Sequence, residues 1–240
     1  MKICVTTLYT DEIAGYGRLA EANKKRYAER RGYDFAAYRS SLDPSRPPSF
    51  SKLTAIREAL ADHDWVFWTD ADSLVMNPHV RLESIVRRAG DHDMILTWET
   101  GAAPFNAGQW LVRNTPWSLA ALAAIAAPDA PNSRPYWFEQ GCLVDWLHAD
   151  PARWQHLRIL HPRLMNATPA SSAQPGLDPD PSRYRLGDFI VHFWPLGRDL
   201  ARVQAAMEHY DGLARTAEGS VVSMLRNQAA AARRTRRFAR

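Results

Sequence analysis

The sequence predicts one α/β domain with a largely parallel sheet flanked by helices, and two observations lead to this fold class. Short apolar segments, typical of buried strands, alternate along the chain with segments rich in good helix formers. The 240 residues are 46% hydrophobic and 23% charged, which suits one domain with a full core rather than two large ones. The same composition excludes collagen-like, disulfide-stapled and wholly disordered proteins.

The first half of the chain is expected to alternate between strands and helices. In chain order the predicted elements are strand Met1–Thr7, helix Arg18–Arg31, strand Tyr33–Tyr38, helix Ser51–Ala61 and strand Trp65–Thr69. Gly32 ends the first helix, because glycine readily takes the left-handed conformation that closes a helix. The prolines of residues 40–48 predict a loop before the second helix. The continuous apolar run Trp65–Thr69 indicates a central strand that is buried on both faces.

The second half continues this alternation less regularly. The predicted elements are strand Asp91–Trp98, strand Gln109–Arg113, helix Trp117–Ala127, helix Gln140–His148, strand Arg158–Leu160 and strand Ile190–Trp194. The proline-rich residues 166–183 predict a long loop, and the last strand is expected to close the core. The apolar pattern weakens from about Thr216. We therefore expect the domain to span residues 1–215, followed by a frayed helix and an arginine-rich tail over residues 216–240.

The positive charge of the chain belongs to its last residues. The formal net charge is +4, but residues 233–240 hold five arginines and no acid. Without them 25 basic residues face 26 acidic ones, so the body is nearly neutral and its charge gives no support to nucleic-acid binding. The arginine cluster is either a solvated end or a surface for contact with an anionic membrane or with nucleic acid.

The sequence also predicts a cytoplasmic location. The sequence contains no run of about eighteen apolar residues, so no membrane span is expected. The N-terminus is typical of a strand rather than a signal peptide. Two cysteines, Cys4 and Cys142, cannot form a disulfide framework, so a reducing compartment is expected.

The motif Asp70-Ala71-Asp72 comes directly after the apolar strand Trp65–Thr69. In open α/β sheets, ligands bind outside the carboxyl ends of the strands. Two carboxylates at such a position repel each other unless a cation lies between them, and a hard divalent cation prefers oxygen ligands. The sequence therefore predicts a metal site here. The alternative is that both acids cap the next helix or face solvent.

Two classes of enzyme use a carboxylate pair after a strand. The haloacid-dehalogenase type of phosphatase carries Thr or Val two residues after the second Asp, where this chain has Leu74, and it needs a later basic residue, normally Lys. No lysine follows Lys52, so the sequence fits this class poorly. The second class is the nucleotide-sugar glycosyltransferases.

Several ordered blocks resemble the galactosyltransferase family that includes yeast mannan-synthesis enzymes and plant xyloglucan xylosyltransferases. The run Trp65–Leu74 looks like the metal-binding motif of that family. The other similar blocks are Asn23–Ala28 with Gly32-Tyr33, Lys52-Leu53 with Ile56-Arg57, Asn106-Ala107-Gly108 with Val112-Arg113-Asn114 and Trp117-Ser118, Glu139-Gln140, and Val191-His192-Phe193. The resemblance as a whole spans roughly residues 3–200, and the order of the blocks makes it far more specific than any single block.

The resemblance implies a GT-A fold and a retaining glycosyltransferase that forms an α-glycosidic bond. The implied ligands of Mn²⁺ or Mg²⁺ are Asp70, Asp72 and His192. The implied donor is a nucleotide sugar, with UDP a better match than GDP. Its base and ribose are expected near Thr6, Thr7, Leu8 and Asp70, and its phosphates near Arg198. The implied acceptor is a glycan or lipid-linked glycan, which favours polysaccharide synthesis at the inner face of a membrane.

The resemblance places Asn106, Glu139 and Gln140 near the donor sugar and the reaction centre. Gln140 would act as nucleophile or only stabilise charge, and the weak nucleophilicity of an amide favours attack by the acceptor on the front face. The sequence departs from the family at Ala107, where Thr or Ser is usual, and at Phe138, where a second acid can occur. The alternative from another class is a non-catalytic nucleotide-sugar or glycan-binding module on the same scaffold.

Overall fold

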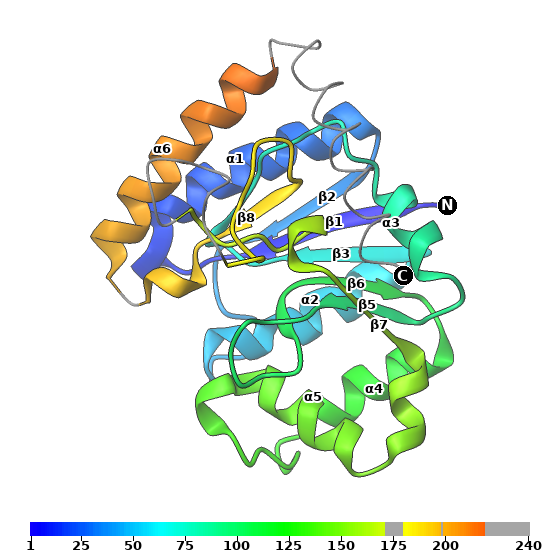
Figure 1. Ribbon diagram of the computed structural model, residues 1–240. Helices are drawn as coiled ribbons and strands as arrows, with labels where there is room; N and C mark the ends of the chain where they lie inside the picture. The colour runs from blue at the N-terminus through cyan, green and yellow to red at the C-terminus, as the bar shows by residue number, and fades with distance from the viewer. Residues whose placement is uncertain (171–179, 198, 219–240) are drawn as a thin grey trace.

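The structure is a computed structural model that describes residues 1–170, 180–197 and 199–218. Within these residues six strands form a main sheet in the order β2-β1-β3-β6-β5-β7 (Figure 1). Their bounds are β1 Ile3–Leu8, β2 Asp34–Tyr38, β3 Trp65–Thr69, β5 Met94–Thr97, β6 Asn106–Arg113 and β7 Leu157–Leu160. β6 runs antiparallel to both of its neighbours and the other pairings are parallel, so the predicted α/β fold with a largely parallel sheet is confirmed.

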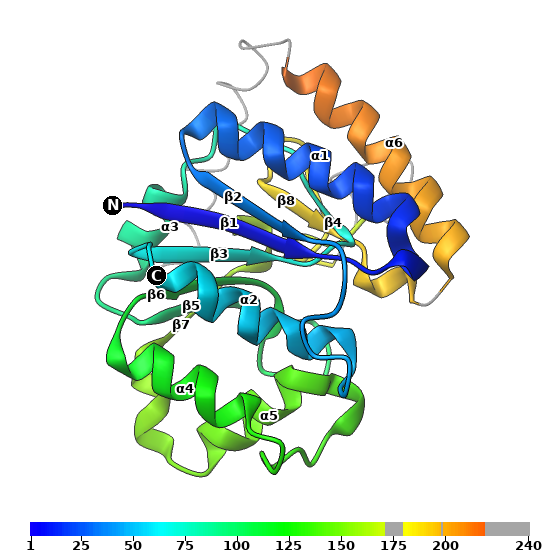
Figure 2. The same ribbon diagram turned by 180° about the vertical axis from the view of Figure 1, so that it is seen from behind.

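Helices cover both faces of this sheet (Figures 1 and 2). They are α1 Ala14–Arg31, α2 Ser51–Leu60, α3 Leu82–Ala89, α4 Pro116–Ala126 and α5 Phe138–His148, whereas a further helix, α6 Leu200–Glu218, packs on α1. On one face α2, α4 and α5 pack over Val66, Trp68 and Trp110. On the other face α1 and α3 pack over Val5 and Phe67. The alternation of side chains along β3 therefore supplies both cores, which explains why all five of its residues are buried.

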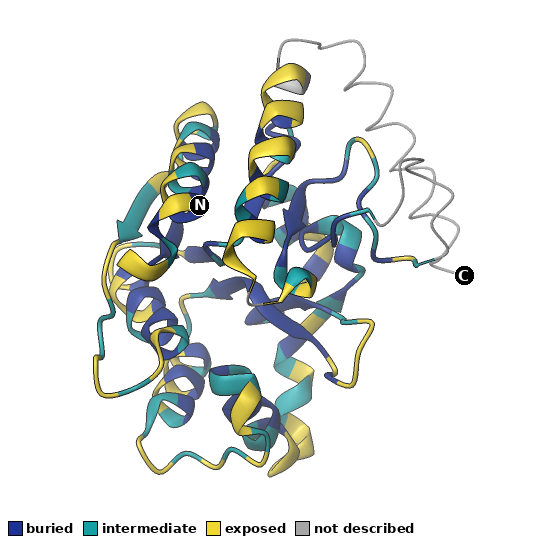
Figure 3. Cartoon of the chain, turned by 90° about the vertical axis from the view of Figure 1, so that its left-hand side faces the viewer, coloured by how far each residue is buried: buried dark blue, intermediate teal, exposed yellow. Residues whose placement is uncertain are grey.

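The predicted end of the first helix is confirmed. Gly32 has a φ of 71°, and its N–H donates to the carbonyl oxygens of Ala28 and Glu29. Figure 3 shows that the outer side of α6 is exposed, whereas Val203 and Met207 of this helix are buried in an apolar cluster with Leu74 and Val191. α6 continues past the predicted boundary at residue 215 as far as Glu218, and residues 219–240 lie outside the described part of the chain.

The last predicted strand forms, but outside the main sheet. Over residues Ile190–His192, β8 pairs antiparallel with β4, the three-residue strand Ser73–Val75. This pairing packs on α1 and α6 in a third buried cluster. The expectation that β8 closes the core beside the other strands was therefore incomplete, because three residues of β4 are too few to show a strand pattern in the sequence.

Among the helices of residues 1–170, 180–197 and 199–218, none has the length together with the apolar sequence that a bilayer crossing needs.

Candidate active site

A cavity of about 570 Å³ opens at the carboxyl ends of β1 and β3. Its walls come from the segment after β1, the loop after β3, the start of β6, the start of α5 and the end of β8. β1 connects through α1 to β2 on one side, and the chain then returns through α2 to β3 on the other side. The cavity thus lies at the point where the order of strands reverses, the usual ligand site of an open α/β sheet.

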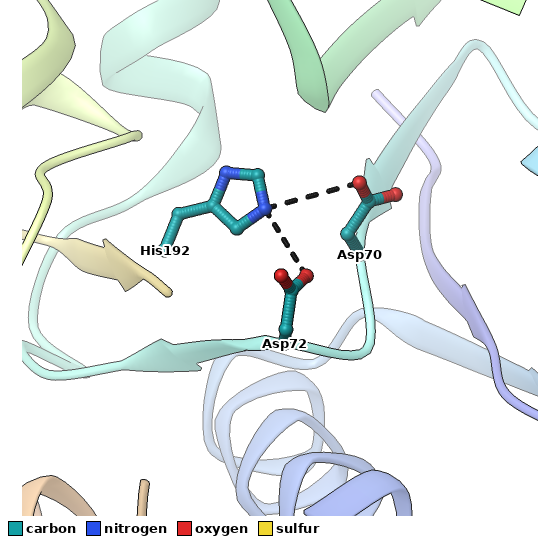
Figure 4. Close-up of side chains that lie close together, drawn as sticks. All are labelled: Asp70, Asp72 and His192. Carbon is teal, nitrogen blue, oxygen red and sulfur yellow. Dashed lines mark hydrogen bonds and ion pairs between the residues drawn. The ribbon is translucent and has the colours of Figure 1, made fainter. Parts of the chain in front are cut away.

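Asp70, Asp72 and His192 converge in this cavity (Figure 4). His192 Nε2 lies 3.1 Å from Asp72 Oδ1 and 3.9 Å from Asp70 Oδ2. One ligand atom from each residue lies within 4.8 Å of the other two. Two carboxylates and an imidazole form a mixed oxygen and nitrogen set that suits Mn²⁺, and also Mg²⁺ through its oxygens. The residues present therefore fit the metal that the sequence predicted.

Backbone pairing brings these three side chains together across 120 residues of sequence. His192 is the register partner of Ser73, the residue after Asp72. The Phe193 N–H donates to the Asp72 carbonyl oxygen at 2.8 Å, and the Asp70 N–H donates to the Gly108 carbonyl oxygen at 2.8 Å. The short β4–β8 sheet is thus the element that adds the imidazole to the two carboxylates.

Gly108 is required by the close approach of the His192 ring. A Cβ atom at this position would lie 2.1 Å from His192 Cε1 and 2.8 Å from His192 Nδ1. Non-bonded heavy atoms do not pack at such short distances, so any other residue at position 108 has to displace the imidazole of His192. This contact explains the glycine of the Asn106-Ala107-Gly108 block.

The amino group of Lys24 is a buried cation that lies against the loop that carries Asp70 and Asp72. The Lys24 side chain is fully buried, and Nζ donates to the Asp70 carbonyl oxygen at 2.5 Å and to Thr7 Oγ1 at 3.3 Å. Burial lowers the pKa of Lys24 to about 7, although the nearby Asp70 and Asp72 favour its charged form. The neighbouring Asn23 exchanges two hydrogen bonds with the backbone of Val75. Helix α1 therefore holds both ends of the segment that contains the two aspartates.

A second buried cation links the metal motif to α5. Lys52 Nζ lies 2.6 Å from Glu139 Oε1 and 3.2 Å from Asp70 Oδ1, and it donates to the Ala107 carbonyl oxygen at 3.0 Å. Burial raises the pKa of Glu139, and the charge of Lys52 opposes that rise. Asp70 Oδ1 also accepts from Trp68 Nε1 at 2.6 Å, which leaves Oδ2 as the oxygen that faces His192.

The amide side chains of the site are fixed by hydrogen bonds. Asn106 Nδ2 donates to Glu99 Oε2 at 2.9 Å, and Asn106 Oδ1 accepts from the Gly108 N–H at 2.9 Å. Gln140 Oε1 accepts from the Ala107 N–H at 2.8 Å. The carbonyl oxygen of Gln140 thus already has a backbone partner, which makes a role as nucleophile still less suitable.

Backbone strain is located at the start of α5. Phe138 has a φ of 51°, a left-handed conformation that a bulky residue rarely adopts. It immediately precedes Glu139 and Gln140, and all three residues line the cavity. Strain of this kind costs on the order of 1–3 kcal/mol and concentrates at functional sites.

The structure brings most of the predicted site residues to one cavity, whose lining includes Leu8, Asp70, Asp72, Asn106, Glu139, Gln140 and His192. Thr6 and Thr7 lie buried in β1 and do not line it. Arg198 lies outside the described residues. Glu99 also lines the cavity, and the only sign of this in the sequence is its position after the end of β5, at the same edge of the sheet.

A model of the galactosyl transferase GMA12/MNN10 family matches residues 11–100 of the chain. This segment contains both aspartates of the metal motif and both buried lysines, whereas His192 lies beyond it. The resemblance to this family is therefore confirmed.

Curated relatives agree with that match. The probable glycosyltransferase 7 of Oryza sativa subsp. indica is 31% identical over 122 residues, which cover 46% of this chain and 27% of the rice protein. An uncharacterized alpha-1,2-galactosyltransferase of Schizosaccharomyces pombe is 24% identical over 216 residues, which cover 74% of this chain and 56% of the yeast protein. The chain thus spans between about a quarter and a little over half of the length of these relatives.

Solved structures of glycosyltransferases share the fold. A glycosyltransferase involved in the glycosylation of the major capsid of PBCV-1 superposes with a TM-score of 0.68 at 20% identity, covering 87% of this chain and 100% of that one. The galactosyltransferase LgtC, solved with donor and acceptor sugar analogues, superposes with a TM-score of 0.52 at 16% identity, covering 89% and 95%. The expected GT-A fold is confirmed.

Proposed function

We propose that the chain is a metal-dependent glycosyltransferase that moves a sugar from a nucleotide-sugar donor to a hydroxyl of a glycan acceptor. One observation carries the proposal. Two carboxylates and one imidazole meet in a cavity at the strand-order reversal of the sheet, beside a buried Lys52–Glu139 pair. The family match and the glycosyltransferase relatives support the reaction class.

Asp70, Asp72 and His192 would hold Mn²⁺ or Mg²⁺. When bound, the ion supplies positive charge that stabilises the departing nucleoside diphosphate. Lys24 and Lys52 hold the loop that carries Asp70 and Asp72, through the Asp70 carbonyl oxygen and the Asp70 carboxylate respectively. UDP-galactose is the donor that the relatives favour, because the yeast relative is named as a galactosyltransferase and the family resemblance implies UDP.

The proposed reaction retains the configuration of the sugar. The acceptor hydroxyl attacks the anomeric carbon on the face from which the nucleoside diphosphate leaves, and its proton passes to the departing phosphate. The geometry of Gln140 supports this route, because its carbonyl oxygen is bound to the Ala107 N–H and an amide is a poor nucleophile. Asn106, Glu99 and Glu139 offer hydrogen-bonding groups for sugar hydroxyls in the same cavity.

We further propose that the enzyme acts in the cytoplasm on a glycan or lipid-linked glycan, with the arginine-rich residues 233–240 in contact with an anionic membrane surface. The support comes from the sequence: the arginine cluster carries a charge of +5 at one end of an otherwise nearly neutral chain.

The test uses the full chain with a panel of nucleotide sugars and Mn²⁺. We expect selective thermal stabilisation by one donor, because a ligand that binds only the folded state raises its stability. We also expect UDP release that depends on both Mn²⁺ and an acceptor. The variant Asp72→Asn should abolish that release and keep the fold, whereas Asp91→Asn, at an exposed position, serves as the matched control.

Three other outcomes would contradict the proposal. Stabilisation by a nucleotide sugar without UDP release, with any acceptor offered, would indicate a binding module. Release of inorganic phosphate through a covalent aspartyl phosphate would indicate a phosphatase of the haloacid-dehalogenase type. Activity of Asp72→Asn within a few-fold of the parent would refute the assignment of the metal site.

A further inference from the structure

The His192 ring has two nitrogens that face different partners. Nε2 faces the carboxylates of Asp72 and Asp70, as Figure 4 shows, and is therefore the nitrogen at the candidate metal position. Nδ1 lies 2.8 Å from Asn166 Oδ1. Because an amide oxygen only accepts hydrogen bonds, this contact requires the proton of the neutral ring to lie on Nδ1. Nε2 of such a ring carries the lone pair that a metal needs, and a cation bound here would replace the proton that Nε2 otherwise donates to Asp72 Oδ1 at 3.1 Å.

Asn166 is itself held firmly. The residue is 2% exposed, and its N–H donates to the Pro162 carbonyl oxygen at 2.6 Å. The next residue, Ala167, pairs with β8: its N–H donates to Ile190, and its carbonyl oxygen accepts from the His192 N–H at 2.7 Å. Backbone bonds thus fix Asn166 beside the histidine that its side chain contacts.

The contact with Gly108 restricts the same ring from a second side. Gly108 leaves room for the ring but does not choose which nitrogen carries the proton, because glycine has no side chain to donate or accept. Among the described residues, the partner of Nδ1 is the Asn166 amide oxygen. Asn166 is therefore the group that favours a proton on Nδ1, whereas the Asp72 carboxylate, 3.1 Å from Nε2, favours a proton on Nε2 when no cation lies between them.

We propose that Asn166 is a positioning residue for the metal site, which holds His192 in the tautomer and orientation that direct the Nε2 lone pair at the cation. This inference rests on the metal-binding role in the proposed function. Groups that orient a histidine ligand in this way typically change metal affinity about 10- to 100-fold when they are removed.

The test compares two substitutions of similar size in the full chain. Asn166→Leu removes the acceptor, and we expect its Kd for Mn²⁺, measured by calorimetry without any substrate, to rise about 10- to 100-fold. Asn166→Asp keeps an acceptor oxygen, and we expect its Kd to stay within a few-fold of the parent. Asn77→Leu is the matched control, because Asn77 is equally buried and bonds to Gly187 and His79 rather than to the ring. It should lower thermal stability and leave the Kd unchanged.

A second measurement covers the case in which Asn166→Leu does not fold. Nitrogen-15 NMR of the parent protein with Zn²⁺, a diamagnetic ion that binds imidazole, should show the His192 proton on Nδ1, and a proton on Nε2 would overturn the inference. An unchanged Kd in folded Asn166→Leu, or an equal loss in Asn166→Asp, would also overturn it. Failure of the parent to bind Mn²⁺ at all would instead refute the proposed function, and this inference with it.

Discussion

Replacement of Lys52 by Met tests how far the site depends on a buried positive charge. Lys52 Nζ contacts Glu139 Oε1 at 2.6 Å and Asp70 Oδ1 at 3.2 Å, and the side chains of Lys52 and Glu139 are 4% and 5% exposed. Met has nearly the shape of Lys without its charge. The substitution therefore leaves the Glu139 carboxylate buried and without its cation, while the packing of the site changes little.

The loss of one partner from a buried ion pair costs about 3–5 kcal/mol. For a domain of this length, each kcal/mol of stability corresponds to about 2–4 °C in melting temperature, so we expect the melting temperature to fall by about 6–20 °C at neutral pH.

The pKa of Glu139 determines how this loss of stability changes with pH. Burial raises its pKa, so the ionised form is unfavourable in the folded state once Lys52 is gone. Protonation removes that cost, and the loss of stability should shrink from about pH 7 to about pH 5.

Thermal unfolding followed by circular dichroism at both pH values measures these effects. The double variant Lys52→Met with Glu139→Gln should recover much of the lost stability, because it removes the uncompensated charge. Lys25→Met is the control, since Lys25 is exposed and its loss should cost no more than about 0.5 kcal/mol. A melting temperature of Lys52→Met equal to that of the parent, or no recovery in the double variant, would refute the reasoning.

Three further predictions concern the metal ligands and the tail. His192→Ala should raise the Mn²⁺ concentration for half-maximal activity by about 10-fold or more; a lower melting temperature with an unshifted Mn²⁺ titration would show a purely structural histidine. Gly108→Ala should weaken Mn²⁺ binding in calorimetry, because its Cβ meets the His192 ring at 2.1 Å, whereas Gly212→Ala, with open space around its Cβ, should not. Deletion of residues 233–240 should leave transfer to a soluble acceptor unchanged, and a loss of that activity would place the tail in the site.

The fold was largely predictable from local patterns. The apolar run Trp65–Thr69 identified the central strand, and Gly32 identified the end of α1. The sequence did not reveal α3 or β4, because α3 has only eight residues and β4 only three, too few for a clear period. The antiparallel direction of β6 was also missed, since direction depends on how the chain crosses the sheet and not on the residues of one strand.

The candidate site was predictable where a family block or a strand end marked it. Asp70 and Asp72 follow a buried strand, and His192 belongs to a block that resembles the family. The roles of Lys24 and Asn166 were not predictable in this way. Each acts through hydrogen bonds to residues far away in the sequence, such as the one from Lys24 to Asp70 across 46 residues and the one between Asn166 and His192 across 26 residues. No periodicity records such a contact.

Because β4 pairs with a strand far later in the sequence, the candidate metal site is completed late in the synthesis of the chain. The main sheet ends with β7 at Leu160, whereas the third candidate ligand, His192, is translated 120 residues after Asp72. At roughly 5–20 residues per second, a ribosome needs roughly 6–24 s to add that length of chain. During that interval the nascent chain carries both aspartates without their histidine. The emergence of β8 from the ribosome therefore marks the earliest moment at which a growing molecule acquires its full set of candidate ligands.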